Sequence, residues 1–220
     1  MMSAKHMGAL FDWDGVVIDS SRQHKASWEA LAEEAGLPLP EDHFERGFGM
    51  INEQIIPDIL GWSTDPMDIQ KYSLRKESIY RESIRREGIQ ALPGVLELLD
   101  LLKDRDIPCV VASSTPKKNI EVVLDIIGVR DHFKAIVASG DVRLGKPDPE
   151  VFLVAANKIG RAPGHCVVFE DAHVGIEAGL SAGCKVVAVA TTNDVADLGT
   201  ADISVETLEQ VDWALLTQLF

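Results

Sequence analysis

The second half of the chain alternates between two patterns of apolar and polar residues. Short runs that are apolar throughout predict strands at 109–112, 135–138, 166–169, 185–190 and 202–205. The segments between them have helical spacing and predict helices at 94–104, 116–127, 149–159 and 172–182, with a further helix at the C-terminal end. Apolar strands that alternate with helices are typical of a parallel sheet covered on both faces.

The first half of the chain has a different pattern. An apolar run at residues 9–11 has the character of the later strands, but helical segments follow it at 20–35, 52–60 and 66–87. Gly36 and Pro38 end the first of these. We therefore predict an α/β fold with a doubly wound, parallel-sheet (Rossmann-like) core. Residues 1–19 and 89–220 form this core, and residues 20–88 form an inserted α-helical cap domain.

The composition narrows the range of partners. The chain has 220 residues, and its 35 acidic against 21 basic residues give a net charge of -14. Nucleic acids and anionic membrane surfaces both require basic patches, so we expect neither as a partner. The three cysteines lie beside apolar runs with no Cys-x-x-Cys spacing, which favours buried free thiols. No apolar signal-peptide core precedes residue 9, and we expect a cytoplasmic protein.

Two carboxylates follow the first apolar run. Asp12 and Asp14 stand two residues apart, and Gly15 follows them. In an open α/β sheet, ligands bind beyond the carboxyl ends of the strands. Two close carboxylates repel each other unless a cation or a proton lies between them, and Mg²⁺ is a natural choice for oxygen ligands. The alternative is a strand end followed by an ordinary Asp-Gly turn.

Polar residues also come after three later strands, directly or at the end of a longer loop. Ser113, Ser114 and Thr115 precede a helix, where they could bind an anion or cap the helix. Lys146 stands between Gly145 and Pro147, which favours a fixed lysine over a mobile surface one. Glu170 and Asp171 end an apolar strand and add two acids to the first pair. Caps and turns explain each group singly, but not all of them at one edge of one sheet.

These stretches together resemble the motifs of the haloacid dehalogenase superfamily. FDWDGVVIDS resembles its first motif, ASS its second, GKPDP its third and FEDAHVGIEAG its fourth. The resemblance covers nearly the whole chain and is strongest to the β-phosphoglucomutase-like branch of sugar-phosphate enzymes, which carry a helical cap after the first strand. It implies a monomer that acts on a small phosphorylated substrate.

The resemblance also implies roles for the site residues. Asp12 would be the nucleophile, and Asp14 the acid and then the base. Ser113, Ser114 and Lys146 would bind the phosphoryl group. Mg²⁺ would be held by Asp12, Asp14 through its main-chain carbonyl, Asp171 and Glu170. Dehalogenases and phosphonatases of the superfamily lack the second aspartate, so Asp14 favours phosphoryl transfer.

The cap residues bear on the choice between a phosphatase and a mutase. His24 and Lys76 match cap positions of β-phosphoglucomutase, although each could equally be an ordinary polar residue of a helix. Asn52 falls where the mutase has an arginine for the second phosphate, which favours hydrolysis and leaves the mutase as the alternative. The stretches GMINEQ and GWSTDP also resemble plant phosphatases of a flavin-pathway intermediate, which keeps a phosphoribityl substrate open.

A non-catalytic binding protein on the same scaffold is a second class of hypothesis. Such proteins usually lose a catalytic carboxylate, and here all of the carboxylates are present. The aromatic residues of the cap could line a binding pocket or fill the interior of the cap, and we expect them to fill the interior. They are Trp28, Phe48, Trp62 and Tyr72.

Overall fold

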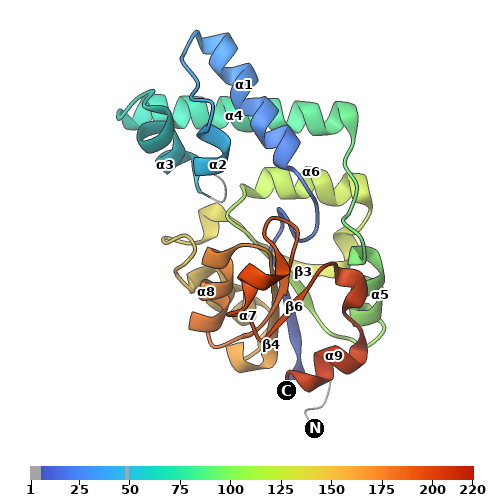
Figure 1. Cartoon of the computed structure of the whole chain (residues 1–220). Coiled ribbons are helices and arrows are strands. Elements are labelled where there is room, and N and C mark those ends of the chain that lie inside the picture. The colour runs from blue at the N-terminus through green and yellow to red at the C-terminus, as the bar shows by residue number, and fades with distance from the viewer. Residues whose placement is uncertain (1–5, 48–49) are drawn as a thin grey trace. The chain divides into compact units, whose positions relative to one another are not determined.

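The computed structural model describes residues 6–47 and 50–220, which form two compact units (Figure 1). Met1–Asp19 and Gln90–Phe220 make up the core unit, and Ser20–Ile89 makes up the cap unit. The return from the insertion thus falls one residue later than the sequence predicts. Inside the core unit, Ile18 pairs with Ala91 in an isolated antiparallel bridge, so the chain leaves and re-enters this unit at one place.

The core unit is built on a six-stranded parallel sheet. Its strands are β1 (Gly8–Phe11), β2 (Cys109–Ala112), β3 (Phe133–Val137), β4 (Cys166–Glu170), β5 (Lys185–Val189) and β6 (Ile203–Val205). Their order is β3-β2-β1-β4-β5-β6, and every pairing is parallel. The predicted doubly wound α/β core is confirmed. The order reverses between β1 and β4, where open α/β sheets bind their ligands.

Helices cover the sheet on both sides. They are α5 (Val95–Lys103), α6 (Lys117–Ile127), α7 (Glu150–Lys158), α8 (His173–Ser181) and α9 (Trp213–Gln218). Short 3₁₀ turns join them at η3 (Arg130–His132), η4 (Ser139–Asp141), η5 (Pro163–His165), η6 (Val195–Leu198) and η7 (Leu208–Gln210). In Figure 1, α7 and α8 lie on one side of the sheet and α5 on the other.

The apolar runs are buried because both faces of the sheet are covered. Leu10, Val110 and Val168 pack against Phe152 of α7 and Ile176 of α8 in one core cluster. Successive side chains of a strand point to opposite faces, so the neighbours of these residues form the second face. The three cysteines are buried free thiols, as predicted.

The cap unit is helical. Its elements are α1 (Ser21–Ala35), α2 (His43–Gly47), α3 (Asn52–Gln54), the π-helix η2 (Ile55–Leu60) and α4 (Pro66–Glu87). The helical segment predicted at 52–60 is confirmed, and within it the α-helix changes to a π-helix after Gln54. Pro57 lies inside this π-helix, and a proline removes one N–H from a helical ladder.

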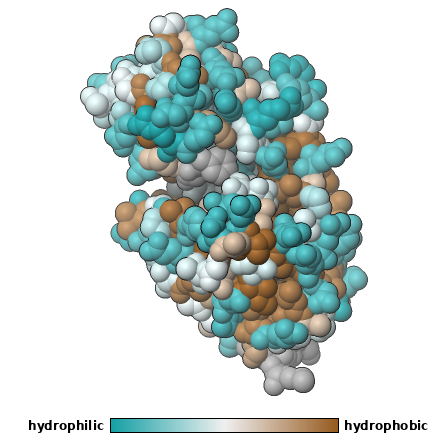
Figure 2. Space-filling view, viewed as in Figure 1, coloured by the Kyte–Doolittle hydropathy of each residue, from teal (hydrophilic) through white to brown (hydrophobic). Residues whose placement is uncertain are grey.

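Aromatic residues fill the interior of the cap unit. Trp28 is buried in its core cluster, and Trp62 and Tyr72 pack against that cluster, as predicted. Phe48 lies outside the described residues. In Figure 2 the visible surface of the cap unit is largely hydrophilic, in agreement with its many charged residues. Within residues 6–47 and 50–220, none of the helices combines the length and apolar character that a membrane span requires.

Candidate active site

Neighbouring strands bring the predicted acids together at the carboxyl edge of the sheet. Strands β1 and β4 pair directly, from Gly8 with Cys166 to Phe11 with Phe169. The next residue, Asp12, continues this contact through a hydrogen bond from its main-chain N–H to the Phe169 carbonyl, with an N–O distance of 3.0 Å. Asp12 therefore lies beside Glu170 and Asp171, which end the same pair of strands.

Lys146 joins two of these carboxylates. Its Nζ atom is 2.8 Å from Asp12 Oδ1 and 2.5 Å from Glu170 Oε1. The lysine side chain is only 6% exposed, and Nζ also lies 5.1 Å from the centre of the Phe152 ring. The structure thus places Lys146 as a fixed, buried cation within the acidic site, as its setting between Gly145 and Pro147 suggested.

Glu170 is held through both carboxylate oxygens. Oε1 accepts from Lys146, and Oε2 accepts from the main-chain N–H groups of Asp171 and Ala172 at 2.8 and 2.9 Å. Gly175 of α8 approaches this carboxylate so closely that a Cβ atom there would lie 1.7 Å from Oε1. The absence of a side chain at this position is therefore a requirement of the site.

Asp171 is held by a loop that the sequence reasoning missed. Thr192 Oγ1 lies 2.6 Å from Asp171 Oδ2, and Asn193 Nδ2 lies 3.0 Å from the Asp171 main-chain oxygen. Both residues follow β5, a strand of the same sheet. Their position beyond a strand end was the available signal, because polar residues there face the edge where ligands bind.

Asp14 is oriented by Thr115 rather than by the lysine. Thr115 Oγ1 donates to Asp14 Oδ2 at 2.5 Å, and Ser113 Oγ accepts from the Thr115 main-chain N–H at 3.1 Å. The alternative in which Ser114 or Thr115 caps the next helix is wrong. The N-cap of α6 is Pro116, and it has no side-chain cap. Ser114 is half-buried beside these residues.

The cluster holds an excess of buried negative charge. Burial raises the pKa of Asp12 to about 7; attraction to Lys146 opposes this shift and repulsion by Glu170 adds to it. Burial raises the pKa of Asp171 to about 8, with repulsion by Glu170 and Asp12 adding to it. Burial alone would lower the pKa of Lys146, but attraction to Asp12 and Glu170 outweighs it, so its pKa lies above the usual value.

The donor set fits a divalent cation. In the part of the chain that the structure describes, Asp12, Glu170 and Asp171 form a group whose ligand oxygens all lie within 4.8 Å of one another. All three are buried, where like charges repel strongly. Carboxylate oxygens are the ligands that hard divalent cations prefer. The Asp14 carboxylate is outside this group.

The stability of the metal-free protein should fall as the pH rises from about 4 to about 8. The pKa values of Asp12 and Asp171 lie near 3.8 in the unfolded chain and at about 7 and about 8 in the folded one. The folded state therefore binds more protons over this range, which stabilises it at low pH only. Calorimetry with a chelator would measure this decline in Tm.

Two variants and the addition of a divalent cation test whether these carboxylates cause the decline in Tm. Asp171→Asn should flatten the Tm profile, whereas Asp104→Asn at an exposed position should not. A divalent cation should raise Tm more at pH 8 than at pH 5, because it binds the ionised carboxylates. A Tm that rises with pH in the presence of chelator would contradict the assignment.

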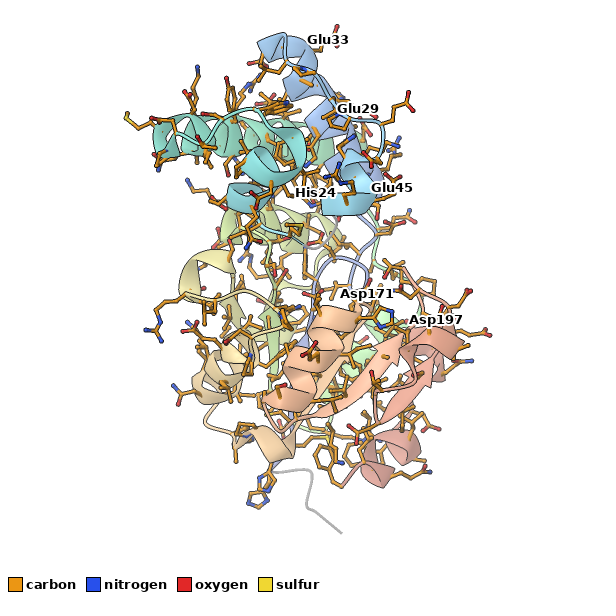
Figure 3. All side chains as sticks on the ribbon, turned by 60° about the vertical axis from the view of Figure 1, so that its left-hand side comes forward. His24, Glu29, Glu33, Glu45, Asp171 and Asp197 are labelled. Carbon is orange, nitrogen blue, oxygen red and sulfur yellow. The ribbon has the colours of Figure 1, made fainter. Side chains whose placement is uncertain are left out.

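The cap unit contains a separate buried polar cluster. Lys76 Nζ lies 2.7 Å from His24 Nδ1 and 3.0 Å from Glu77 Oε1, and Asn52 Nδ2 donates to the same Glu77 oxygen at 2.7 Å. His24 lies on α1 (Figure 3) and stacks on the Tyr80 ring. The structure thus brings the predicted residues His24, Asn52 and Lys76 together. Lys76 is buried, unlike an ordinary charged residue of a helix surface.

Comparisons with known proteins agree with this site. The sequence matches the haloacid dehalogenase-like hydrolase family over residues 6–183. The chloroplastic 5-amino-6-(5-phospho-D-ribitylamino)uracil phosphatase of Arabidopsis thaliana is 37% identical over 96% of this chain and 57% of its own length. Beta-phosphoglucomutase of Bacillus subtilis is 34% identical over 93% of this chain and 94% of its own length. Hexitol phosphatase A of Escherichia coli is 33% identical over 93% of this chain and 92% of its own length.

The chain thus spans little more than half the length of the plant relative. Among solved structures, a family IA, variant 3 HAD hydrolase from Entamoeba histolytica matches with a TM-score of 0.87 and 30% identity, over 97% of this chain and 98% of that one. Beta-phosphoglucomutase from Clostridium difficile matches with a TM-score of 0.85 and 27% identity, over 100% of this chain and 97% of that one. These matches confirm the resemblance that the four motifs indicated. This chain belongs to the haloacid dehalogenase-like hydrolase family.

Proposed function

We propose that this protein is a Mg²⁺-dependent phosphatase that hydrolyses a small phosphorylated metabolite through an aspartyl phosphate on Asp12. The observation that carries the proposal is the buried group of Asp12, Glu170 and Asp171 with Lys146 beside it. A carboxylate can attack a phosphate ester only where the charges of both are screened, and this group is arranged for that screening.

The first half-reaction transfers the phosphoryl group to the protein. A carboxylate oxygen of Asp12 forms a bond to phosphorus while the bond from phosphorus to the leaving oxygen breaks. Protonated Asp14 gives its proton to that oxygen, so the product leaves as an alcohol. Lys146 and the hydroxyl of Ser113 stabilise the negative charge on the phosphoryl oxygens, with Ser114 beside them.

The second half-reaction releases inorganic phosphate. Asp14, now a carboxylate, takes a proton from water while the water oxygen attacks phosphorus, and the bond from phosphorus to Asp12 breaks. Thr115 donates to Asp14 Oδ2 and so holds this carboxylate in place. Mg²⁺ would supply positive charge against the phosphoryl oxygens, held by Asp12, Asp171, Glu170 and the main-chain carbonyl of Asp14.

The cap cluster favours hydrolysis over a mutase reaction. A mutase must bind a second phosphate on its substrate, which calls for a guanidinium or a free ammonium group. Asn52 offers an amide instead, and that amide already donates to Ser73 and Glu77. Glu77 also neutralises Lys76 at 3.0 Å. The mutase remains the second candidate because a relative named beta-phosphoglucomutase is 34% identical to this chain.

The names of the relatives and the net charge indicate the class of substrate. The phosphatase relatives have names that specify phosphorylated polyol or ribityl compounds, and we infer a substrate of this class, such as a sugar phosphate or a phosphoribityl compound. The net charge of -14 disfavours nucleic acid as a partner. We further infer a cytoplasmic monomer.

Phosphorus NMR with Mg²⁺ on a panel of phosphorylated metabolites tests the proposal. The panel includes β-glucose 1-phosphate with a trace of its bisphosphate, a hexitol phosphate and a phosphoribityl compound. We expect free phosphate to accumulate from at least one member and to stop when a chelator is added. Conversion of the 1-phosphate to the 6-phosphate without free phosphate would establish the mutase. No turnover across the panel would favour a binding protein.

A further inference from the structure

The loop after β5 holds Asp171 from outside the four sequence motifs. We propose that Thr192 and Asn193 are positioning residues that fix the Asp171 carboxylate as a cation ligand and so set the Mg²⁺ affinity of the site. This inference rests on the proposed function, because it assigns a task to residues around the same site.

The hydrogen bonds form a directed chain. The hydroxyl of Thr192 has one proton and donates it to Asp171 Oδ2 across 2.6 Å. The amide of Asn193 has two protons, and its Nδ2 atom lies 3.1 Å from Thr192 Oγ1 and 3.0 Å from the Asp171 carbonyl oxygen. A hydroxyl that accepts a hydrogen bond is a better donor, so Asn193 strengthens the bond from Thr192 to the carboxylate.

This arrangement holds the Asp171 carboxylate and leaves part of it open to a cation. Thr192 takes Oδ2, which leaves Oδ1 and the second lone pair of Oδ2 for a cation. Gly15 also lies close to this carboxylate, because a Cβ atom there would lie 2.1 Å from Oδ2 and 2.8 Å from Oδ1. Figure 3 shows Asp171 at the N-terminal end of α8.

The loop depends on these polar contacts for its position. Thr191, the preceding residue, lines a cavity of about 190 Å³ together with Val16, Ala190 and Thr207. The loop is therefore not closely packed at this point, and Thr192 itself is exposed. An apolar replacement of Thr192 removes the hydrogen bond without disturbing the core, so its effect reports on the carboxylate.

Calorimetric titration of the substrate-free protein with MgCl₂ tests the inference. Thr192→Val should raise the dissociation constant for Mg²⁺ about 10- to 100-fold, the range known for residues that orient metal ligands. Thr192→Ser keeps the hydroxyl and should bind like the wild type, and Asn193→Ala should show a smaller loss than Thr192→Val. Thr217→Val removes an exposed hydroxyl that donates to the Ala214 carbonyl, far from the site in sequence, and serves as the matched control.

The separate effects on kcat and on Mg²⁺ affinity give a second readout. At saturating Mg²⁺, kcat of Thr192→Val should return close to the wild-type value, because the variant loses affinity and no reacting group. Unchanged Mg²⁺ binding in Thr192→Val would overturn the inference. Equal losses in the Val and Ser variants would also overturn it, since the hydroxyl would then have no part. A wild-type protein that binds no Mg²⁺ would instead overturn the proposed function itself.

Discussion

Replacing Asp12 with Asn is expected to lower kcat at least about 10⁴-fold, because loss of a covalent nucleophile removes the whole reaction path. The amide is nearly the same size, so the site keeps its shape. Lys146 retains Glu170 as a partner at 2.5 Å. Steady-state release of phosphate from the best substrate of the panel measures the effect.

The same substitution should not weaken the fold. Burial raises the pKa of Asp12 to about 7, so its ionised form is unfavourable in the metal-free protein at pH 8. A neutral side chain removes that cost, and Tm in the presence of chelator should rise at this pH. Asp104→Asn, at an exposed position of the core unit, is the matched control and should leave both kcat and Tm unchanged. Asp12→Asn activity above about one hundredth of the wild type would rule out Asp12 as the nucleophile.

Replacing Gly175 with Ala is expected to lower kcat by about 10²-fold or more, because a displacement of about 1 Å at a catalytic group has effects of that size. The new Cβ atom would lie 1.7 Å from Glu170 Oε1. Glu170 cannot move away without breaking bonds to Lys146 or to the N–H groups of Asp171 and Ala172. The displacement therefore reaches both the lysine and the cation ligands, and Mg²⁺ affinity should fall with kcat.

Two other glycines separate this effect from a general loss of stability. Gly179 lies on the same helix, and a Cβ atom there would lie 2.9 Å from a methyl group of Val186. Gly179→Ala should therefore lower Tm while kcat stays close to the wild type. Gly140 has nothing within 4 Å of its Cβ position, so Gly140→Ala should change neither quantity. A wild-type value of kcat in Gly175→Ala would show that the reaction does not depend on the exact position of the Glu170 carboxylate.

The sheet and the acidic site follow from local patterns in the sequence. The strands are short and mostly apolar; Asp12 and Ser113 stand directly after β1 and β2, and Glu170 is the last residue of β4. Parallel strands bring their carboxyl ends to a common edge, so knowledge of the strands was sufficient to bring these side chains together. The strand pattern alone did not predict the position of Lys146, because this residue follows no strand directly. Its flanking residues Gly145 and Pro147 were the signal that indicated a fixed lysine.

Other features depend on tertiary packing and leave only a weak local signal in the sequence. Thr192 and Asn193 are common loop residues, and their bond to Asp171 arises only because β5 lies next to β4. Lys76 stands in a helix rich in charged residues, and the local charge pattern does not distinguish it from exposed neighbours such as Lys71. Its burial results from the packing of α1 against α4, which places His24 beside it.

The position of β1 in the sheet has a consequence for the order of folding. It is the first strand to be synthesised, yet it lies between β2 and β4, which begin at Cys109 and Cys166. Pairings between such distant segments close large loops and form slowly. During synthesis, the apolar residues of β1 must therefore remain unpaired until β2, near the middle of the chain, has left the ribosome. The nucleophile next to them gains its surroundings only when β4 arrives with Glu170 and Asp171, so a nascent chain that stops short of β4 holds a complete cap sequence but no site for chemistry.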